Sequence, residues 1–514
     1  MSLSDSFRHP WRMCIAVGRA YDLMRADLRE HLAALQREMG YKYCRFHAVF
    51  HDDMKVVTRR PDGSLRFHWH HVDKIYDFLL SIELRPLVEL NPMPSALASG
   101  SRTMFYYKMN VTPPRDWSEW GQLVESFARH LIDRYGICEV REWLFEVWNE
   151  PNLEAFWSGS KEDYFRLYEE SALALHRVDS GLRVGGPATS KARWISDLIE
   201  YCTARKIPLD FVSTHLYPQD EFVEYPDRSS SPHAAGEFFI DIVRGVQREV
   251  AASSRPDLPI YWTEWNTQSA ADAASVTWGD NVYVDNLHAA ALIVRNCLAL
   301  DDACDALTWW VASDIFEEGP IPSAPFSCTY GMMTIHGIPK ASMNAFRFLR
   351  RLTGRRVLSG IAGAPPGAGV MAALEGDTLR VIAWHAVLDF SAPLPEPWTA
   401  RIELPPEYAS ARSATLEVIR AKQGSAYEAW IEMGKPENLL PAEERYLRRC
   451  AEPYTAAVNP AADGGVLHVK LAPGEVALWE IRSPSLAEES VQRRADLGES
   501  WKAWEAGMSG KSRV

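Results

Sequence analysis

The hydrophobic pattern of residues 1–350 alternates between two periods. Short apolar runs, of the length and composition of strands buried on both faces, are separated by longer segments with apolar residues at helical spacing. Eight such runs occur: RMCIAVG from Arg12, YCRFHAVF from Tyr43, LRPLVEL from Leu84, WLFEVWNE from Trp143, LRVGGPA from Leu182, DFVSTHLY from Asp210, IYWTEWN from Ile260 and ALTWWVAS from Ala306. This alternation is typical of α/β proteins with parallel strands, and eight units predict a (β/α)8 TIM barrel over residues 1–350.

The pattern changes after residue 350. Runs such as TLRVIAWHAV, ARIEL, VLHVKL and VALWEI alternate apolar and polar residues between Gly, Pro and Asp turns, which predicts an accessory antiparallel β-sandwich over residues 351–485. The stretch SAYEAWIEMGKPENLLPAEERYLRRC interrupts it and predicts a helical insertion. Residues 486–514 are rich in charge and predict a C-terminal helical tail.

Composition narrows the range of partners. The 68 acidic residues exceed the 55 basic ones, the net charge is -13, and Lys and Arg form no stripe that would hold a phosphate backbone. No apolar run reaches the roughly 18 residues of a membrane span, and the first residues lack the basic and apolar regions of a signal peptide. We therefore expect a cytoplasmic protein that binds neither nucleic acid nor membrane, and the sequence leaves the oligomeric state open.

Cysteine and histidine patterns do not predict a metal or cofactor. The eight cysteines never form a C-x-x-C pair, which disfavours a zinc ribbon or a redox pair. The run FHWHH places His68, His70 and His71 close together, but no cysteine or carboxylate cluster completes a ligand set. We predict a surface turn there, and no cofactor for the chain.

Two acidic residues lie at the C-terminal ends of predicted strands, where a TIM barrel has its active site. Pro151 cannot continue a central strand, so it ends the fourth run and places Glu150 at the mouth of the barrel. Glu264 ends the seventh run in the same way. The fourth and seventh strands face each other across such a pocket, and two opposed carboxylates can cleave a glycosidic bond.

Tryptophans surround both acids, among them Trp262 and Trp265, and the chain contains 19 Trp. Partial desolvation favours the protonated form of a carboxyl group and suits it to act as a general acid, while indole rings can pack on sugar rings. The alternative is that the aromatic residues only fill a large core. That alternative explains Trp143 but not Glu150, because unpaired acids are almost never fully buried.

The motifs WNEPN and TEWN together resemble the retaining glycoside hydrolases of clan A. Further blocks in the same order resemble family 39, which contains β-xylosidases and α-L-iduronidases: RFHAVFHDDM, ELNPMPSALASG, STHLYP, TWWVASDIFEE and FSCTYGMMTIHGIPKASMNAF. The resemblance covers nearly the whole chain, including SAYEAWIEMGKPE in the second domain.

The resemblance implies a role for individual residues. It implies Glu150 as acid/base, Glu264 as nucleophile and Asn149 as the partner of the sugar 2-hydroxyl. It places His215 and Tyr217 beside the nucleophile, with the Tyr217 hydroxyl donating to Glu264. The remaining residues that it implies in sugar binding are His47, Asp53, Trp310, Glu317 and Glu318, although the last two could otherwise be a solvated loop pair.

The activity that this resemblance implies is that of a retaining, exo-acting β-xylosidase, which releases xylose from the non-reducing end of xylo-oligosaccharides such as xylobiose. An α-L-iduronidase-like activity is the alternative within the family, and it requires a cationic clamp for the uronate that the sequence does not identify. A non-catalytic carbohydrate-binding barrel is the alternative of another class. Binding alone does not require two opposed carboxylates, which disfavours it.

Overall fold

The computed structural model describes residues 6–217, 237–267, 283–316, 318–319, 322–359, 361–389 and 393–483. Within these residues no helix combines the length and the apolar character needed to cross a membrane. The predicted tail, residues 486–514, lies outside the described residues.

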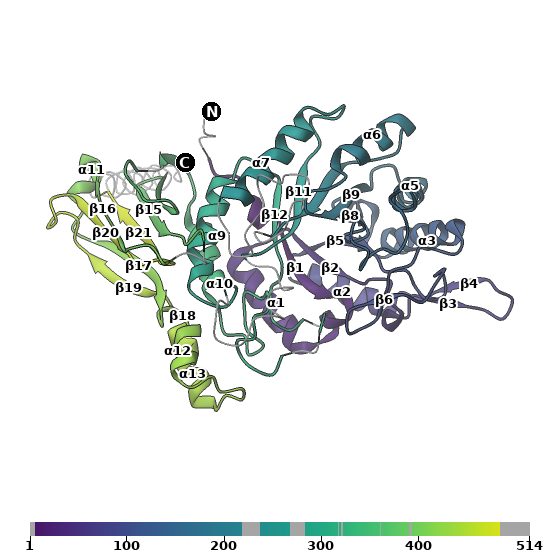
Figure 1. Cartoon of the computed structure of the whole chain (residues 1–514), viewed down its shortest axis with the longest axis horizontal. Helices are drawn as coiled ribbons and strands as arrows, with labels where there is room; N and C mark the ends of the chain where they lie inside the picture. The colour runs from purple at the N-terminus through teal and green to yellow at the C-terminus, as the bar shows by residue number, and fades with distance from the viewer. Residues whose placement is uncertain are drawn as a thin grey trace, which may run out of the picture.

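Eight parallel strands close into a barrel (Figure 1), in the spatial order β1-β12-β11-β10-β9-β8-β5-β2. They are β1 (Cys14–Arg19), β2 (Tyr43–His47), β5 (Arg85–Leu90), β8 (Leu144–Val147), β9 (Arg183–Ser190), β10 (Phe211–His215), β11 (Ile260–Trp265) and β12 (Ala306–Trp309). Each predicted apolar run overlaps one of these strands, so the barrel prediction is confirmed. Nearly every strand residue is buried, because helices cover the outside and side chains fill the inside.

Amphipathic helices surround the barrel and bury their apolar faces against it. The longer ones are α1 (Ala26–Met39), α2 (His70–Ser81), α3 (Trp117–Tyr135), α5 (Lys161–Val178), α6 (Ile195–Arg205), α7 (Glu237–Ala251), α9 (His288–Ala299) and α10 (Ala341–Arg351). Short elements lie in the connections: η1 (Pro10–Arg12), η2 (Ala20–Met24), η3 (Asp52–Met54), α4 (Ile137–Val140), the hairpin β3 (Val57–Arg59) with β4 (Leu65–Phe67), and the hairpin β6 (Thr103–Met104) with β7 (Met109–Asn110).

The C-terminal region contains two antiparallel β layers beside the barrel, in green to yellow in Figure 1. The larger sheet holds β13 (Arg355–Ser359), β14 (Ala368–Glu375), β15 (Thr378–His385), β17 (Ala414–Ala421), β18 (Gly424–Ser425), β19 (Tyr454–Val458) and β21 (Val476–Arg482), and the smaller pairs β16 (Trp398–Glu403) with β20 (Val466–Leu471). Alternate residues of both form one apolar cluster, as expected for a sandwich, and α11 (Pro406–Ala409) adds Tyr408 to it. The proposed domain boundary near residue 350 falls at the end of α10.

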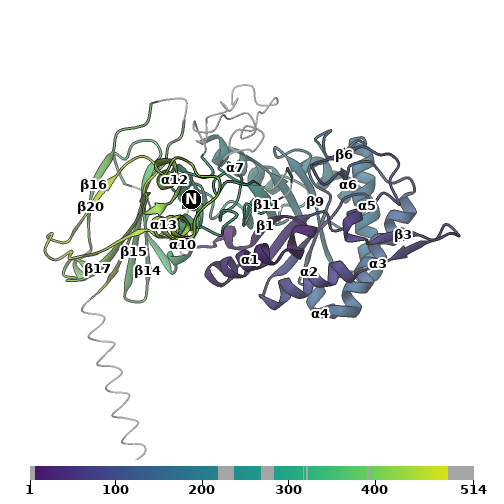
Figure 2. The same cartoon turned by 90° about the horizontal axis from the view of Figure 1, so that it is seen from below.

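The predicted insertion is helical, with α12 (Tyr427–Glu432) and α13 (Pro441–Cys450). Trp430 and Leu447 from these helices pack with Phe326 and Ile338 of the segment that follows β12. The Asn344 side chain of α10 donates to carbonyl groups on both sides of the insertion, at 2.9 and 2.7 Å. Figure 2 shows α12 and α13 beside α10, so the insertion braces the connection that leads from the last barrel strand.

Gly185 of β9 tests how tightly the barrel is packed. A Cβ at this position would lie 2.4 Å from both the carbonyl oxygen and the ring of Phe211 on β10. We predict that Gly185→Ala lowers the free energy of unfolding by about 1–3 kcal/mol or more, because backbone cannot move aside without disturbing the barrel. The midpoint of thermal unfolding measures this loss.

Gly245 of α7 is the matched control, since a Cβ there meets nothing closer than 3.9 Å. Gly245→Ala should stabilise the protein slightly, by up to about 1 kcal/mol, because alanine favours a helix over glycine. Equal effects of the two substitutions would contradict the packing of β9 against β10.

Candidate active site

The chain turns sharply where β8 ends, and this turn presents Glu150. Trp148 and Glu150 adopt left-handed φ angles of 70° and 44°, which cost about 1–3 kcal/mol each and are typical of functional sites. Two bonds hold the turn, from the Glu150 backbone N–H to the Ala188 carbonyl at 2.8 Å and from the Trp148 indole N–H to the Phe156 carbonyl at 2.9 Å. Glu150 is 8% exposed and opens onto the mouth of the barrel, as the sequence predicts.

Glu264 lies at the end of β11, and both of its carboxylate oxygens accept hydrogen bonds. The Arg45 guanidinium donates to Oε1 at 2.7 Å, and the Tyr217 hydroxyl donates to Oε2 at 3.0 Å. The predicted contact between Tyr217 and Glu264 is therefore present. These two donors fix the orientation of the carboxylate.

The two acids lie close together across the barrel. One carboxylate oxygen of Glu150, one of Glu264 and a ring nitrogen of His215 all lie within 4.8 Å of one another. Retaining glycosidases separate their carboxyl groups by about 5–5.5 Å, whereas inverting enzymes need about 6.5–9.5 Å to fit a water molecule between the general base and the sugar. The geometry suits the retaining mechanism.

Arg45 of β2 links the strands below this pair and is a residue that the sequence interpretation missed. Its fully buried guanidinium bonds Glu146 of β8 at 2.6 Å, Glu89 of β5 at 2.6 Å and Glu264 of β11 at 2.7 Å. It also donates to the Asn149 side-chain oxygen at 2.9 Å and lies 3.5 Å from His215 Nε2. A signal was available, because a charged residue within a buried run such as CRFHAVF requires buried partners of opposite charge.

Burial and charge act differently on the groups around Arg45. Burial acts to lower the pKa of Arg45, but Glu146, Glu89 and Glu264 outweigh it and hold that pKa well above its usual value. Burial likewise raises the pKa of Glu146, yet Arg45 outweighs it, so the pKa is lowered and Glu146 is ionised. For Glu89 burial prevails and raises the pKa to about 8, so this acid is largely protonated at neutral pH.

Glu150 is in a different environment from Glu264. Burial raises the pKa of Glu150 to about 7, only partly opposed by a hydrogen bond from Ser190 and by more distant cations. Its nearest ring partner is His215, with Nδ1 at 3.1 Å from Oε1, and burial lowers the pKa of His215 to about 4. A neutral imidazole does not stabilise the carboxylate as a cation would, so Glu150 keeps its proton near neutral pH.

The structure brings together several of the residues predicted to bind sugar. His47 contacts both Glu89 oxygens through Nδ1 at 2.9 Å and lies 3.8 Å from Glu264 through Nε2. The ring of Trp310, directly after β12, is centred 4.6 Å from the His47 ring. Together with Asn149 these side chains line the space beside the two acids.

The other three residues predicted to bind sugar are Asp53, Glu317 and Glu318. Asp53 pairs with Arg19 and, at 2.8 Å, with His51, so its carboxylate is tied into an ion pair at the rim and is not brought to Glu264. Glu317 lies outside the described residues. Glu318 is half-buried, and burial together with Glu264 and Glu150 raises its pKa well above the usual value, which indicates a protonated carboxyl facing the site.

Long connections after β5, β8 and β12 build a wall around the mouth. The Tyr106 backbone N–H donates to the Glu318 carbonyl at 2.9 Å, which joins the β6–β7 hairpin to the connection after β12. Phe105 in that hairpin stacks on His47, with ring centres 6.4 Å apart, and meets Phe156 from the β8 connection at 5.2 Å.

A buried ion cluster anchors the connection after β12. The Lys340 ammonium contacts Asp285, Asp314 at 2.7 Å and the Thr329 carbonyl at 2.9 Å, and none of the three charged side chains reaches solvent appreciably. Asp314 also accepts from the Gly331 backbone N–H at 2.8 Å. The cluster thereby fixes the backbone next to Tyr330, whose ring contacts Tyr217, the donor to Glu264.

Glu150, His215 and Glu264 are close enough for one cation to bridge them. The donor set fits poorly, because both Glu264 oxygens already accept hydrogen bonds and one donor is the Arg45 guanidinium. A second cation there would be repelled by Arg45.

Glu146 and Glu89 test the charge assignment. Glu146→Gln should cost about 3–5 kcal/mol at pH 7, because it removes an ionised partner from buried Arg45. Glu89→Gln should cost only about 1 kcal/mol, because an amide replaces a carboxyl that is already largely protonated. Thermal unfolding of both variants measures the difference, and an equal loss would contradict it.

A family model described as "Glycosyl hydrolases family 39" matches residues 2–468. A "Beta-xylosidase" of Caldicellulosiruptor saccharolyticus is 39% identical over 430 residues, 83% of this chain and 85% of that protein. A "Beta-xylosidase" of Geobacillus stearothermophilus is 32% identical and covers 93% of both chains. The solved structure of a "GH39 Beta-xylosidase from Caulobacter crescentus" superposes with a TM-score of 0.76 at 31% identity, covering 93% of this chain and 97% of that one.

The family match spans the barrel and most of the accessory sheets, and it includes both acids and every residue that surrounds them. The chain belongs to glycoside hydrolase family 39.

Proposed function

We propose that this protein is a retaining, exo-acting β-xylosidase in which Glu264 is the nucleophile and Glu150 the acid/base. The observation that carries the proposal is the close approach of two carboxylates in unlike environments. One is held by Arg45 and Tyr217, and the other has a pKa raised to about 7. Such a pair separates acid from nucleophile at one pH.

In the first step Glu264 attacks the anomeric carbon and the glycosidic bond breaks, while Glu150 transfers its proton to the leaving oxygen. The product of this step is a covalent glycosyl-enzyme and a free aglycone. Among the described residues the Asn149 Nδ2 group donates to no side chain or carbonyl, which leaves it for the 2-hydroxyl of the sugar.

In the second step Glu150, now ionised, removes a proton from water, which attacks the anomeric carbon and displaces Glu264. Two inversions give net retention. Arg45 keeps its position beside Glu264 through both steps. Its bonds to Glu146 and Glu89 hold it in place when Glu264 loses its negative charge in the first step and regains it in the second.

The two arginines near the site favour a neutral pentose over a uronate. An iduronide would need a cation to bind its carboxylate, and neither arginine is free for this: Arg45 is committed to three acids, and Arg19 is paired with Asp22 at 3.2 Å and with Asp53. Both relatives that match over most of the chain carry the name beta-xylosidase, which also supports xylose. A cytoplasmic location stays a prediction from the sequence.

The wall around the mouth supports exo action on short xylo-oligosaccharides. Because the β6–β7 hairpin is bonded to the connection after β12, the described part of the chain leaves no open groove between these two connections. We expect single xylose units to be released, without internal cuts in xylan.

Variants of the two acids test the assigned roles. Glu264→Ala should lower kcat by about four orders of magnitude or more for every substrate, because no covalent intermediate can form. Glu150→Ala should lose about 10²–10⁴-fold on xylobiose, but still react with an activated aryl xyloside in a burst, since that leaving group needs no proton. Steady-state and stopped-flow release of the phenol measure both.

Azide supplies the control, because it attacks without a general base. It should restore turnover of Glu150→Ala and yield a β-xylosyl azide. A β-azide from Glu264→Ala together with an α-azide from Glu150→Ala would reverse the two roles. Cleavage of an aryl iduronide but not of the xyloside would refute the substrate assignment.

The pKa of Glu150 predicts the basic limb of the pH profile. Because burial raises this pKa to about 7, the protonated acid prevails below pH 7 and is lost as the pH rises above it. We expect kcat/KM for xylobiose to fall tenfold per pH unit on that side, with an inflection near pH 7. Ser190→Ala should move the inflection to higher pH, because the Ser190 hydroxyl bonds the ionised form. An inflection near the pH of an ordinary carboxyl, or one unmoved by Ser190→Ala, would contradict this.

A further inference from the structure

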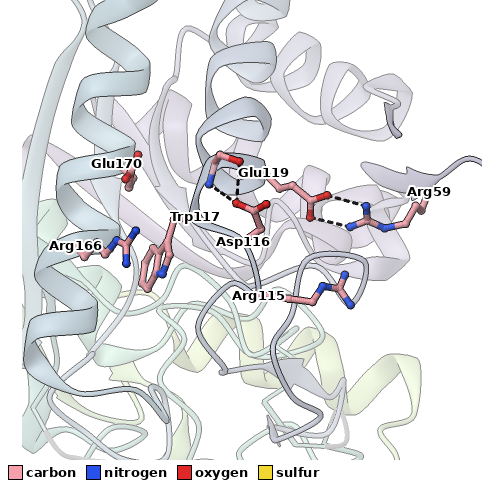
Figure 3. Close-up of a pocket in the computed structure, with 8 residues that line it drawn as sticks. Arg59, Arg115, Asp116, Trp117, Glu119, Arg166 and Glu170 are labelled. Atoms are coloured by element: carbon pink, nitrogen blue, oxygen red, sulfur yellow. Dashed lines mark hydrogen bonds and ion pairs between the residues drawn. The ribbon is translucent and has the colours of Figure 1, made fainter. Parts of the chain in front are cut away.

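A polar cavity of about 740 Å³ lies on the outside of the barrel, away from the two acids. It is formed by the start of α3, by Arg166 and Glu170 in the first half and middle of α5, and by Arg59 from the β3–β4 hairpin (Figure 3). We call it the outer groove. Its volume falls in the range of sites that hold small ligands, roughly 300–1,000 Å³.

The outer groove opens at the same end of the barrel as the catalytic mouth. Helices α3 and α5 begin after β5 and β8, so their first turns lie at the C-terminal ends of these strands. Strand β8 leads to Glu150, the proposed acid, which must lie on the side of the departing aglycone.

The charges in the outer groove balance. Three arginines, Arg59, Arg115 and Arg166, meet three acids, Asp116, Glu119 and Glu170. A groove without net charge does not favour a polyanion or a polycation. It does offer many planar donors and acceptors, which suits a neutral ligand rich in hydroxyl groups.

The floor of the outer groove is flat and partly aromatic. The Arg166 guanidinium carbon lies 4.6 Å from the centre of the half-buried Trp117 ring, and Figure 3 shows the two side by side. Indole and guanidinium surfaces of this kind pack against the C–H face of a sugar ring while the guanidinium N–H groups reach its hydroxyls.

The walls of the outer groove are held in place, yet retain bonding capacity. Arg59 and Glu119 form a bidentate pair at 2.7 and 2.8 Å. Arg115 donates one bond to the Ala96 carbonyl at 2.8 Å and keeps further N–H groups. The half-buried Glu170 carboxylate accepts no hydrogen bond from the described part of the chain.

We propose that the outer groove is a second carbohydrate site, which binds a neutral xylo-oligosaccharide segment on the aglycone side of the enzyme. The proposal rests on the proposed function, since it takes the substrate class from there. Arg166 and Glu170 on α5 would hydrogen-bond vicinal hydroxyls, and Trp117 would support a ring. The site would hold a long chain near the mouth without taking part in the chemistry.

Affinity electrophoresis of the full chain in native gels that contain soluble neutral xylan tests the proposal, with gels lacking xylan as reference. The polymer has few chain ends, so binding at the catalytic mouth contributes little. We expect the wild type to be retarded, and Arg166→Ala and Glu170→Ala each to lose most of that retardation. Arg129→Ala is the matched control, because Arg129 is an exposed arginine of α3 that pairs with Glu125 outside the outer groove.

Kinetics separate this proposal from the proposed function. Arg166→Ala and Glu170→Ala should leave kcat/KM for an aryl xyloside unchanged, but lower it about three- to tenfold for xylohexaose. Wild type that is not retarded, or Arg166→Ala and Glu170→Ala that are retarded like wild type, would overturn the outer groove even if the xyloside is cleaved. Retardation by polygalacturonate instead of xylan would also overturn it. Failure to cleave the xyloside, with retardation intact, would refute the proposed function alone.

Discussion

The site depends on the buried guanidinium of Arg45. It connects β2 to acids on β5, β8 and β11, which are Glu89, Glu146 and Glu264. Removing this charge from water costs several kcal/mol, and only several well-placed acceptors can offset that cost. The same contacts that keep the cation stable therefore also determine where the Glu264 carboxylate lies.

The barrel produces two different acids from one residue type. Glu264 touches a cation and a hydroxyl donor, while Glu150 lies against a neutral imidazole, and burial raises its pKa to about 7. The separation of their properties does not come from distance, since their oxygens are within 4.8 Å. It comes from the direct partners of each carboxylate, because Arg45 of β2 donates to Glu264 whereas the ring partner of Glu150 is the neutral His215.

Outside the acids, the connection after β12 unites the two parts of the chain. Lys340 fixes it from inside through Asp314, and the helical insertion packs on it through Trp430 and Phe326. Tyr330 in this connection reaches the hydroxyl donor of Glu264. The accessory region therefore supports the mouth of the barrel indirectly. Its described residues pack on the connection after β12 and place no side chain beside the two acids.

The sequence by itself determined the barrel and its two acids. The period of the hydrophobic pattern distinguishes buried strands from amphipathic helices. Because Pro151 also marks a strand end, Glu150 and Glu264 could be placed at the mouth without coordinates. The family pattern likewise led to His47, His215, Tyr217 and Trp310.

Only the tertiary structure decided how these residues pair. Arg45 and its acids are separated by 44 to 219 residues, so no local pattern joins them. Asp53 pairs with Arg19 because the end of β1 and the connection after β2 meet at the rim. Which acid keeps its proton is decided in the same way. Desolvation and charge are sums over neighbours in space, and closure of the barrel determines which residues those neighbours are.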